Sequence, residues 1–91
     1  MKFDWDDNKA ESNRSKHGVR FEEAQTVFDN PLAVIFDDEW HSGEEQREII
    51  VGHSAANRLL LVCFTERADT IRLISARPAT RQESKDYEES V

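Results

Sequence analysis

Apolar and polar positions in the first third of the chain predict one short strand and two helices. Two aromatic residues alternate with polar ones over 2–5 and predict an edge strand. Asp6 or Asp7 is a suitable N-cap for a polar helix that ends at Gly18, because glycine adopts the left-handed conformation of a helix C-terminus at low cost. A second, amphipathic helix follows and is ended by Pro31. Its apolar face consists of Phe21, Ala24, Val27 and Phe28.

The remaining apolar segments have the length and spacing of strands. A short β-rich run over 33–36 precedes an acidic loop, and three longer segments follow in quick succession. These are 47–53, 59–65 and 70–76, and their short connections make an antiparallel meander the simplest arrangement. The segment 59–65 is apolar throughout, so we expect it to be central and covered on both faces, one of them by the amphipathic helix.

A capping box begins the last predicted element. Thr80 is followed three residues later by Glu83, which predicts the start of a helix over 82–91. With two N-terminal helices, the meander and this C-terminal helix, the pattern predicts an α+β fold in a single domain, 1–91. Only Tyr87 and Val91 are apolar in the terminal helix, so we expect it to dock weakly unless something else covers it.

Composition limits the classes of protein to which the chain can belong. Of its 91 residues, 37% are hydrophobic and 34% are charged, which suits a small domain with a thin core. Cys63 is the single cysteine and lies in an apolar run, so we expect it to be a buried apolar residue. The sequence has no apolar stretch of signal-peptide or membrane-span type, and a cytoplasmic location is the expectation.

Positive charge is concentrated in one part of an otherwise acidic chain. The net charge is −7, yet residues 57–81 contain five arginines against two carboxylates. Arginine suits phosphodiester chemistry because guanidinium stays charged and binds phosphate through two parallel hydrogen bonds. If the last hairpin is centred near 67–69, Arg77 lies opposite Leu59, and Arg72 lies on the other face of the sheet. His53, Arg58 and Arg77 would then gather at one end of the sheet.

Each candidate for catalysis also has a purely structural interpretation. His17, beside Lys16, is the best general acid or base, but it can equally cap the first helix. Arg77 can hold a phosphate at the end of a strand, but it can equally pair with a carboxylate. His41 and His53 are interpreted as surface residues and Tyr87 as a packing residue. The stretch DDEWHSGEE contains metal-ligand residue types without a standard spacing, so neither a metal nor another cofactor is expected.

Three stretches of the sequence resemble a known family over nearly the whole chain. The stretches FDWDDNKAESNRSKHGVRFEEAQTVFDNP, HSGEEQREIIVGHS and NRLLLVCFTERADTIRLISARPATRQESKDYEE are similar, in this order, to BrnT toxins of type II toxin–antitoxin operons. The resemblance implies a RelE-like α+β fold and a ribonuclease that arrests translation. It also implies neutralisation by a BrnA antitoxin with a ribbon-helix-helix domain, through which the complex reaches operator DNA.

The resemblance further implies metal-independent cleavage of RNA by in-line attack of the ribose 2′-hydroxyl. The residues implied for this site are Lys16, His17, Arg67, Arg72 and Arg77. His17 would carry the proton, Arg77 would hold the phosphate, and the other two arginines would bind the RNA backbone or the transition-state charge.

Two features depart from that family, and two other functions stay open. Arg20 stands where the family is expected to have serine, which removes the usual N-cap of the second helix. The acidity of the chain is also unusual for a protein that binds RNA. A module that binds the antitoxin without cutting RNA is therefore one alternative. A structural α+β domain with solvated arginines is the other.

Overall fold

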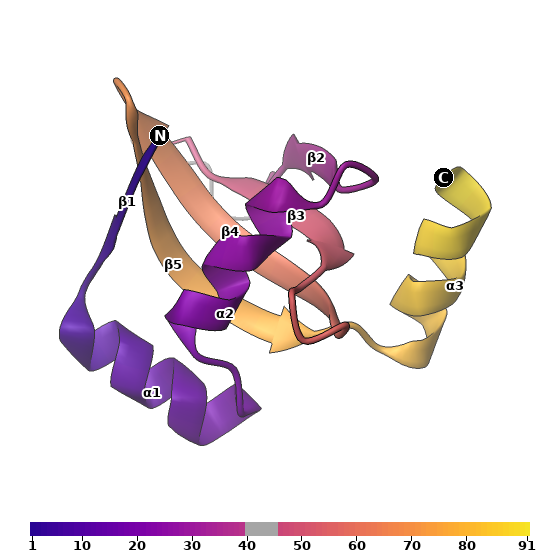
Figure 1. The fold of residues 1–91 in the computed structure, drawn as a ribbon, viewed down its shortest axis with the longest axis horizontal. Coiled ribbons are helices and arrows are strands. Elements are labelled where there is room, and N and C mark those ends of the chain that lie inside the picture. Colours follow the sequence, from indigo (N-terminus) through magenta and orange to yellow (C-terminus); the bar gives the residue numbers. More distant parts are fainter. Residues whose placement is uncertain (40–45) are drawn as a thin grey trace.

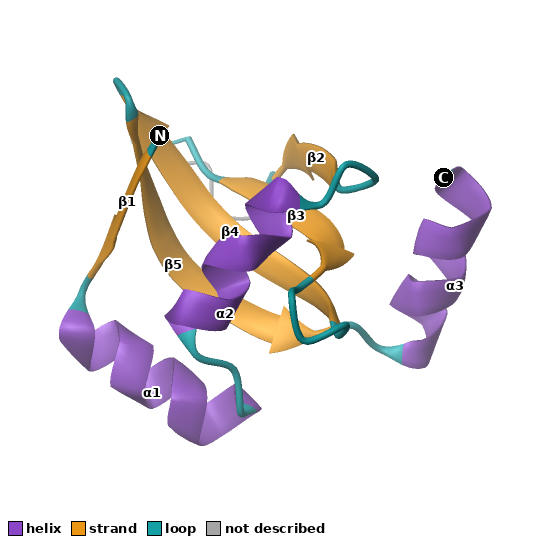
Figure 2. Ribbon diagram, in the orientation of Figure 1, coloured by secondary structure: helices purple, strands orange, loops and turns teal. Residues whose placement is uncertain are grey.

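The computed structural model describes residues 1–39 and 46–91, in which a five-stranded sheet is combined with three α-helices (Figures 1 and 2). The strand order is β1-β5-β4-β3-β2, and the α+β class is confirmed. Residues 40–45 of the predicted acidic loop, with His41, lie outside the described residues. The strands are β1 (Lys2–Trp5), β2 (Val34–Asp37), β3 (Glu48–His53), β4 (Leu59–Arg67) and β5 (Thr70–Pro78).

The strands β3, β4 and β5 form the predicted antiparallel meander, and β2 extends it by antiparallel pairing with β3, which leaves β4 at the centre of the sheet. At the edge next to β5, strand β1 pairs in parallel, so the sheet is mixed. The edge position predicted for the N-terminal strand is therefore confirmed, and its partner is the last strand of the chain.

The helices are α1 (Asp7–His17), α2 (Phe21–Gln25) and α3 (Arg81–Ser90), with a 3₁₀ turn, η1 (Thr26–Asp29), continuing α2. The side chain of Asp6 accepts a hydrogen bond from the Lys9 amide at the start of α1, and Gly18 ends that helix with φ +68°. The predicted capping box of α3 is present. No side chain caps α2, because Arg20 at that position has no oxygen acceptor.

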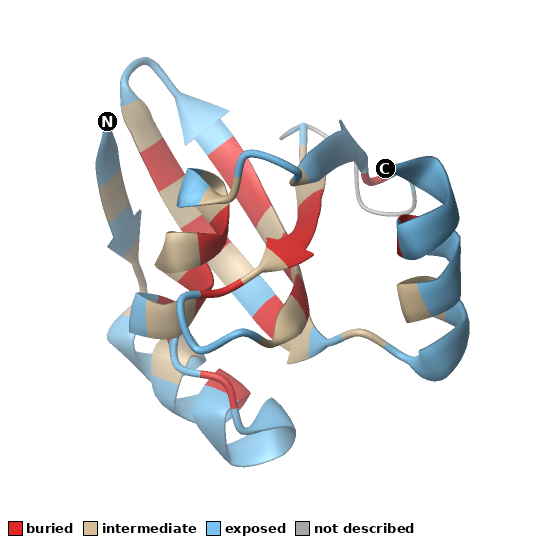
Figure 3. Cartoon of the chain, turned by 45° about the vertical axis from the view of Figure 1, so that its right-hand side comes forward, coloured by how far each residue is buried: buried red, intermediate tan, exposed pale blue. Residues whose placement is uncertain are grey.

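The core lies between one face of the sheet and the helices α1 and α2, where the buried residues of Figure 3 gather. It includes Phe21, Ala24 and Val27 together with Leu60, Val62, Phe64 and Leu73. We call the opposite face of the sheet the open face. On this face of β4, Thr65 is buried but Leu61 and Cys63 are only half-buried, so the prediction that both faces of this strand are covered is wrong for most of this side. Helix α3 stands beside the open face instead of lying across it (Figure 1).

A β-bulge changes the register of the last hairpin. Arg77 lies opposite Leu61, whereas the sequence predicted Leu59, and Arg72 lies opposite Thr65. The shift lies next to Cys63, where β5 contains one extra residue, Ile74. An extra residue reverses the alternation of side chains along the strand. Leu73 and Ala76 are consequently both in the core, and Arg72 and Arg77 are both on the open face, so the prediction that they lie on opposite faces is wrong.

Candidate active site

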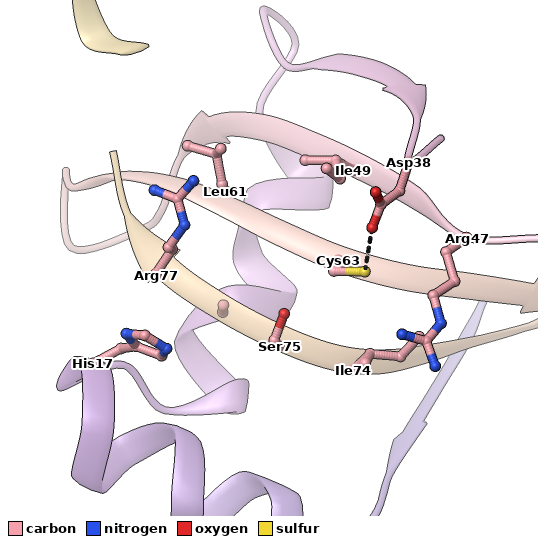
Figure 4. Close-up of a pocket in the computed structure, with 10 residues that line it drawn as sticks. His17, Asp38, Arg47, Ile49, Leu61, Cys63, Ile74, Ser75 and Arg77 are labelled. Carbon is pink, nitrogen blue, oxygen red and sulfur yellow. Dashed lines mark hydrogen bonds between the residues drawn. The ribbon is translucent and has the colours of Figure 1, made fainter. Parts of the chain in front are cut away.

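A pocket of about 310 Å³ lies on the open face, between the end of α1 and the strands β3, β4 and β5. Two of the five predicted residues line it, His17 from α1 and Arg77 from β5. In Figure 4 these two lie toward one end of the pocket and Arg47 toward the other, with Ser75 between them. The full lining is His17, Asp38, Arg47, Ile49, Leu61, Cys63, Ile74, Ser75, Ala76 and Arg77.

Asn13 fixes the helix that carries His17 to the strand that carries Arg77. Its side-chain amide donates hydrogen bonds to the carbonyls of Val19 (3.0 Å) and Ala76 (2.8 Å), and its oxygen accepts one from the Ala76 amide (2.9 Å). Asn13 is 5% exposed, so water does not compete for these bonds. Nothing in the sequence indicated this role of Asn13.

Arg77 is oriented by Glu83 of α3. Two guanidinium nitrogens donate to the two carboxylate oxygens at 2.7 and 2.8 Å. These hydrogen bonds are the main cause of the low pKa of Glu83, about 2, with a smaller contribution from the Thr80 amide. Arg77 therefore has the carboxylate partner that its structural interpretation predicted. A guanidinium has five N–H donors, so others stay available for a phosphate.

Lys16 lies next to His17, at a shallower hollow of about 220 Å³ that also touches Ile74 and Ser75. Arg72 and Arg67 are outside the pocket lining. Arg72 lies farther along the open face and is paired with Asp4 at 3.2 Å, while Arg67 ends β4 at the hairpin turn. Arg72 is opposite Thr65 and Arg77 is opposite Leu61, four residues away along β4, so about 13 Å separates these two positions.

Arg47 is a candidate residue that the sequence interpretation missed. It precedes β3 and lines the pocket, and the neighbouring Gln46 carbonyl accepts a hydrogen bond from Thr65 at 2.9 Å. Thr65 is also opposite Arg72, so Arg47 and Arg72 lie on the two sides of Thr65 across the sheet. The predicted strand over 47–53 already contained the signal, since Arg47 is its first residue. It was overlooked because it lies outside the arginine-rich segment.

The predicted cluster of His53, Arg58 and Arg77 does not form. Arg58 turns toward α2, where its Nε donates to Glu23 at 2.9 Å, and these contacts lower the pKa of Glu23. The ring of His53 meets that of Tyr87 edge-on, with 5.8 Å between centroids. Arg77 is engaged by Glu83 instead.

Cys63 lines the pocket and is only half-buried, whereas the sequence predicted a buried residue. Desolvation raises its pKa to about 11, and the negative charge of Asp38 adds to this shift. The thiol donates to Asp38 at 3.7 Å (Figure 4). Within 1–39 and 46–91, no group of three or more histidine, cysteine or acidic side chains is arranged to hold a metal ion. In the same residues, no helix is long and apolar enough to cross a membrane.

Comparison with known proteins gives a family and a similar fold. Residues 5–83 match the model of a family described as ribonuclease toxin, BrnT, of type II toxin–antitoxin system. The crystal structure of the Brucella abortus ribonuclease toxin BrnT, at 1.1 Å resolution, is similar in fold, with a TM-score of 0.69 and 24% identity. The match covers 89% of this chain and 99% of that one. A search of curated proteins gave no match.

Proposed function

Because the chain belongs to the BrnT family of ribonuclease toxins of type II toxin–antitoxin systems, we propose that it cleaves RNA at the pocket on the open face of its sheet. The observation that carries this proposal is that His17 and Arg77 line one pocket although they are distant in sequence. An imidazole can accept a proton near neutral pH, and a guanidinium can bind the phosphate where the reaction occurs.

The proposed reaction is an attack of the ribose 2′-oxygen on the adjacent phosphorus. His17 accepts the proton of the 2′-hydroxyl, and the bond between phosphorus and the 5′-oxygen breaks as the new bond forms. The leaving 5′-oxygen takes a proton from water. Arg77 holds the phosphate and stabilises the negative charge that grows on it, and Lys16 adds positive charge at the same end of the pocket. DNA lacks the attacking hydroxyl and would not be cut.

The other arginines would bind the RNA backbone on either side of the cleaved bond. The bulge at Ile74 supports this role for Arg72, since it brings Arg72 to the same face as Arg77. Arg47 lines the pocket at the end away from Arg77, and Arg67 would extend the track toward the hairpin turn. With this charge supplied by arginines, the reaction as proposed needs no metal ion, and cleavage should persist in the presence of EDTA.

The wider proposal follows from the family. The chain would form one RelE-like domain, 1–91, act in the cytoplasm and arrest translation by cleaving RNA. An antitoxin partner is implied for a toxin of this type. We propose that it is BrnA-like, with a ribbon-helix-helix domain through which the complex reaches operator DNA.

Expression of the chain in bacteria from a tightly controlled promoter tests the proposal. The wild type should arrest growth and degrade RNA, and purified protein should cleave single-stranded RNA. His17→Ala should lower the cleavage rate about 10²- to 10⁴-fold and Arg77→Ala about 10²- to 10³-fold. Arg81→Ala removes an exposed arginine outside the pocket and is the matched control.

Normal growth with well-expressed wild type, together with intact RNA in the purified assay, would contradict the ribonuclease proposal. The module that binds an antitoxin without cutting RNA would then be the better interpretation. Equal loss of activity in all three variants would show that the pocket is not the site.

A further inference from the structure

A second hollow, of about 350 Å³, lies between the open face and helix α3. We call it the α3 groove. Its apolar wall is formed by Val34 and Phe36 of β2, Val51 of β3, Leu61 of β4 and Tyr87 of α3. Tyr87 and Val51 are 6% and 8% exposed, but Phe36 is 47% and Val34 is 37% exposed. A half-exposed phenylalanine on an edge strand is typical of a surface that a partner covers.

The polar residues of the α3 groove are mainly acidic. Glu83 and Asp86 line it, with Ser90 at the end of the helix. Helix α3 as a whole carries four carboxylates against two cationic side chains. This charge opposes RNA and also a second copy of the chain, whose net charge is −7. It favours an occupant that combines apolar side chains with lysine or arginine.

We infer that the α3 groove binds a basic, amphipathic segment of the antitoxin. Apolar side chains of that segment cover Val34 and Phe36, while its cations face Asp86 and the exposed side of Glu83. This inference rests on the proposed function, since it takes the antitoxin as the partner. It adds the surface that is bound and the chemistry of the segment that binds there.

The position of the α3 groove gives this binding a consequence for the candidate active site. Leu61 lines both the groove and the active-site pocket. Glu83 of the groove is also the residue that holds the Arg77 guanidinium. A segment seated in the groove therefore lies beside the proposed phosphate site, where it would obstruct the approach of RNA.

Two pairs of variants test the inference, with the proposed BrnA-like antitoxin as the binding probe. Phe36→Ser should weaken binding by at least about tenfold, whereas Ile35→Ser should not. Ile35 is the matched control because it is 51% exposed on the same strand and does not line the groove. Asp86→Lys should weaken binding by a similar factor and Glu88→Lys should not, since Glu88 is on the same helix outside the groove lining.

Isothermal titration calorimetry of each folded variant gives the dissociation constants, and hydrogen exchange of the complex locates the surface. Protection of residues 34–37 and 81–90 on binding is expected. Equal effects within each pair, protection elsewhere, or no binding by the wild type would overturn the inference. If Phe36→Ser fails to fold, the comparison of Asp86→Lys with Glu88→Lys still tests the inference. Growth arrest by the chain alone tests the proposed ribonuclease function separately. A failure of that proposal can therefore be distinguished from a failure of the inference about the α3 groove.

Discussion

Arg77 and Glu83 are the residues through which the C-terminal helix and the active-site pocket are connected. The ion pair joins the end of β5 to the first turn of α3, and the same carboxylate also accepts the Thr80 amide at 2.9 Å. Glu83 therefore serves both the helix cap and the orientation of the arginine. Loss of its charge should therefore lower the stability of the protein and also leave the Arg77 side chain less well oriented in the pocket.

The low pKa of Glu83 predicts how stability depends on pH. A carboxyl group whose pKa is lowered by folding, here from 4.5 to about 2, stabilises the protein above pH 4.5 and loses this effect as the pH falls toward 2. Both side chains of the pair are partly exposed, so solvent screening limits the contribution to about 1 kcal/mol. Urea unfolding should show Glu83→Gln to be less stable than the wild type at pH 7 and closer to it at pH 2.5.

Glu88→Gln is the control for this prediction, because Glu88 is exposed on the same helix. It should follow the wild type at every pH, including the part of the pH dependence that belongs to the Glu23–Arg58 pair. A stability difference for Glu83→Gln that is the same at pH 7 and pH 2.5 would contradict the assignment of the ion pair.

Sequence reasoning at the scale of single residues identified the right residue types more reliably than their partners. The N-cap at Asp6, one of the two aspartates predicted for it, the C-terminal Gly18 and the capping box of Thr80 are all confirmed, and each depends on residues within a few positions. The contact of Arg58 with Glu23 crosses 35 positions and depends on the packing of α2 against the sheet. Local chemistry could not predict it.

Asn13 connects α1 to β5, so its substitution should lower the free energy of unfolding. Asn13→Ala removes three hydrogen bonds and leaves the buried amide and carbonyl of Ala76 without this partner. We expect a loss of about 2 to 4 kcal/mol in the free energy of unfolding, measured by chemical denaturation. Ser15→Ala, at an exposed position of the same helix, should change stability by less than about 0.5 kcal/mol. A small effect of Asn13→Ala would contradict its role in fixing α1 to β5.

The bulge shows why the elements could be predicted and the site only in part. Strand-length segments and short connections were sufficient for the order of β3, β4 and β5. Nothing in the sequence around Ile74 marks an inserted residue, because neither a glycine nor a proline stands there. A one-residue change of register moves every later side chain to the other face, so the placement of Arg77 required the structure.

At the scale of the whole molecule, charge separates the proposed RNA site from the proposed partner site. The open face carries Arg47, Arg72 and Arg77, whereas the α3 groove beside it is lined by carboxylates and the chain as a whole is acidic. Single-stranded RNA should therefore be attracted to a limited stretch of the surface and repelled elsewhere. The acidity of the chain is therefore compatible with RNA cleavage, because the arginines are grouped on the open face.

The salt dependence of RNA binding measures how many arginines take part. Each phosphate contact with single-stranded RNA contributes about −0.7 to the slope of log affinity against log salt, so the four arginines of the proposed site predict a slope of about −3. Fluorescence anisotropy with His17→Ala, which binds without cutting, should give this value, and an added Arg72→Ala should make the slope shallower by about 0.7. Arg81→Ala should leave it unchanged. A slope near zero would mean that the arginines stay with their carboxylates, and a slope beyond about −5 would mean that RNA binds well outside the open face.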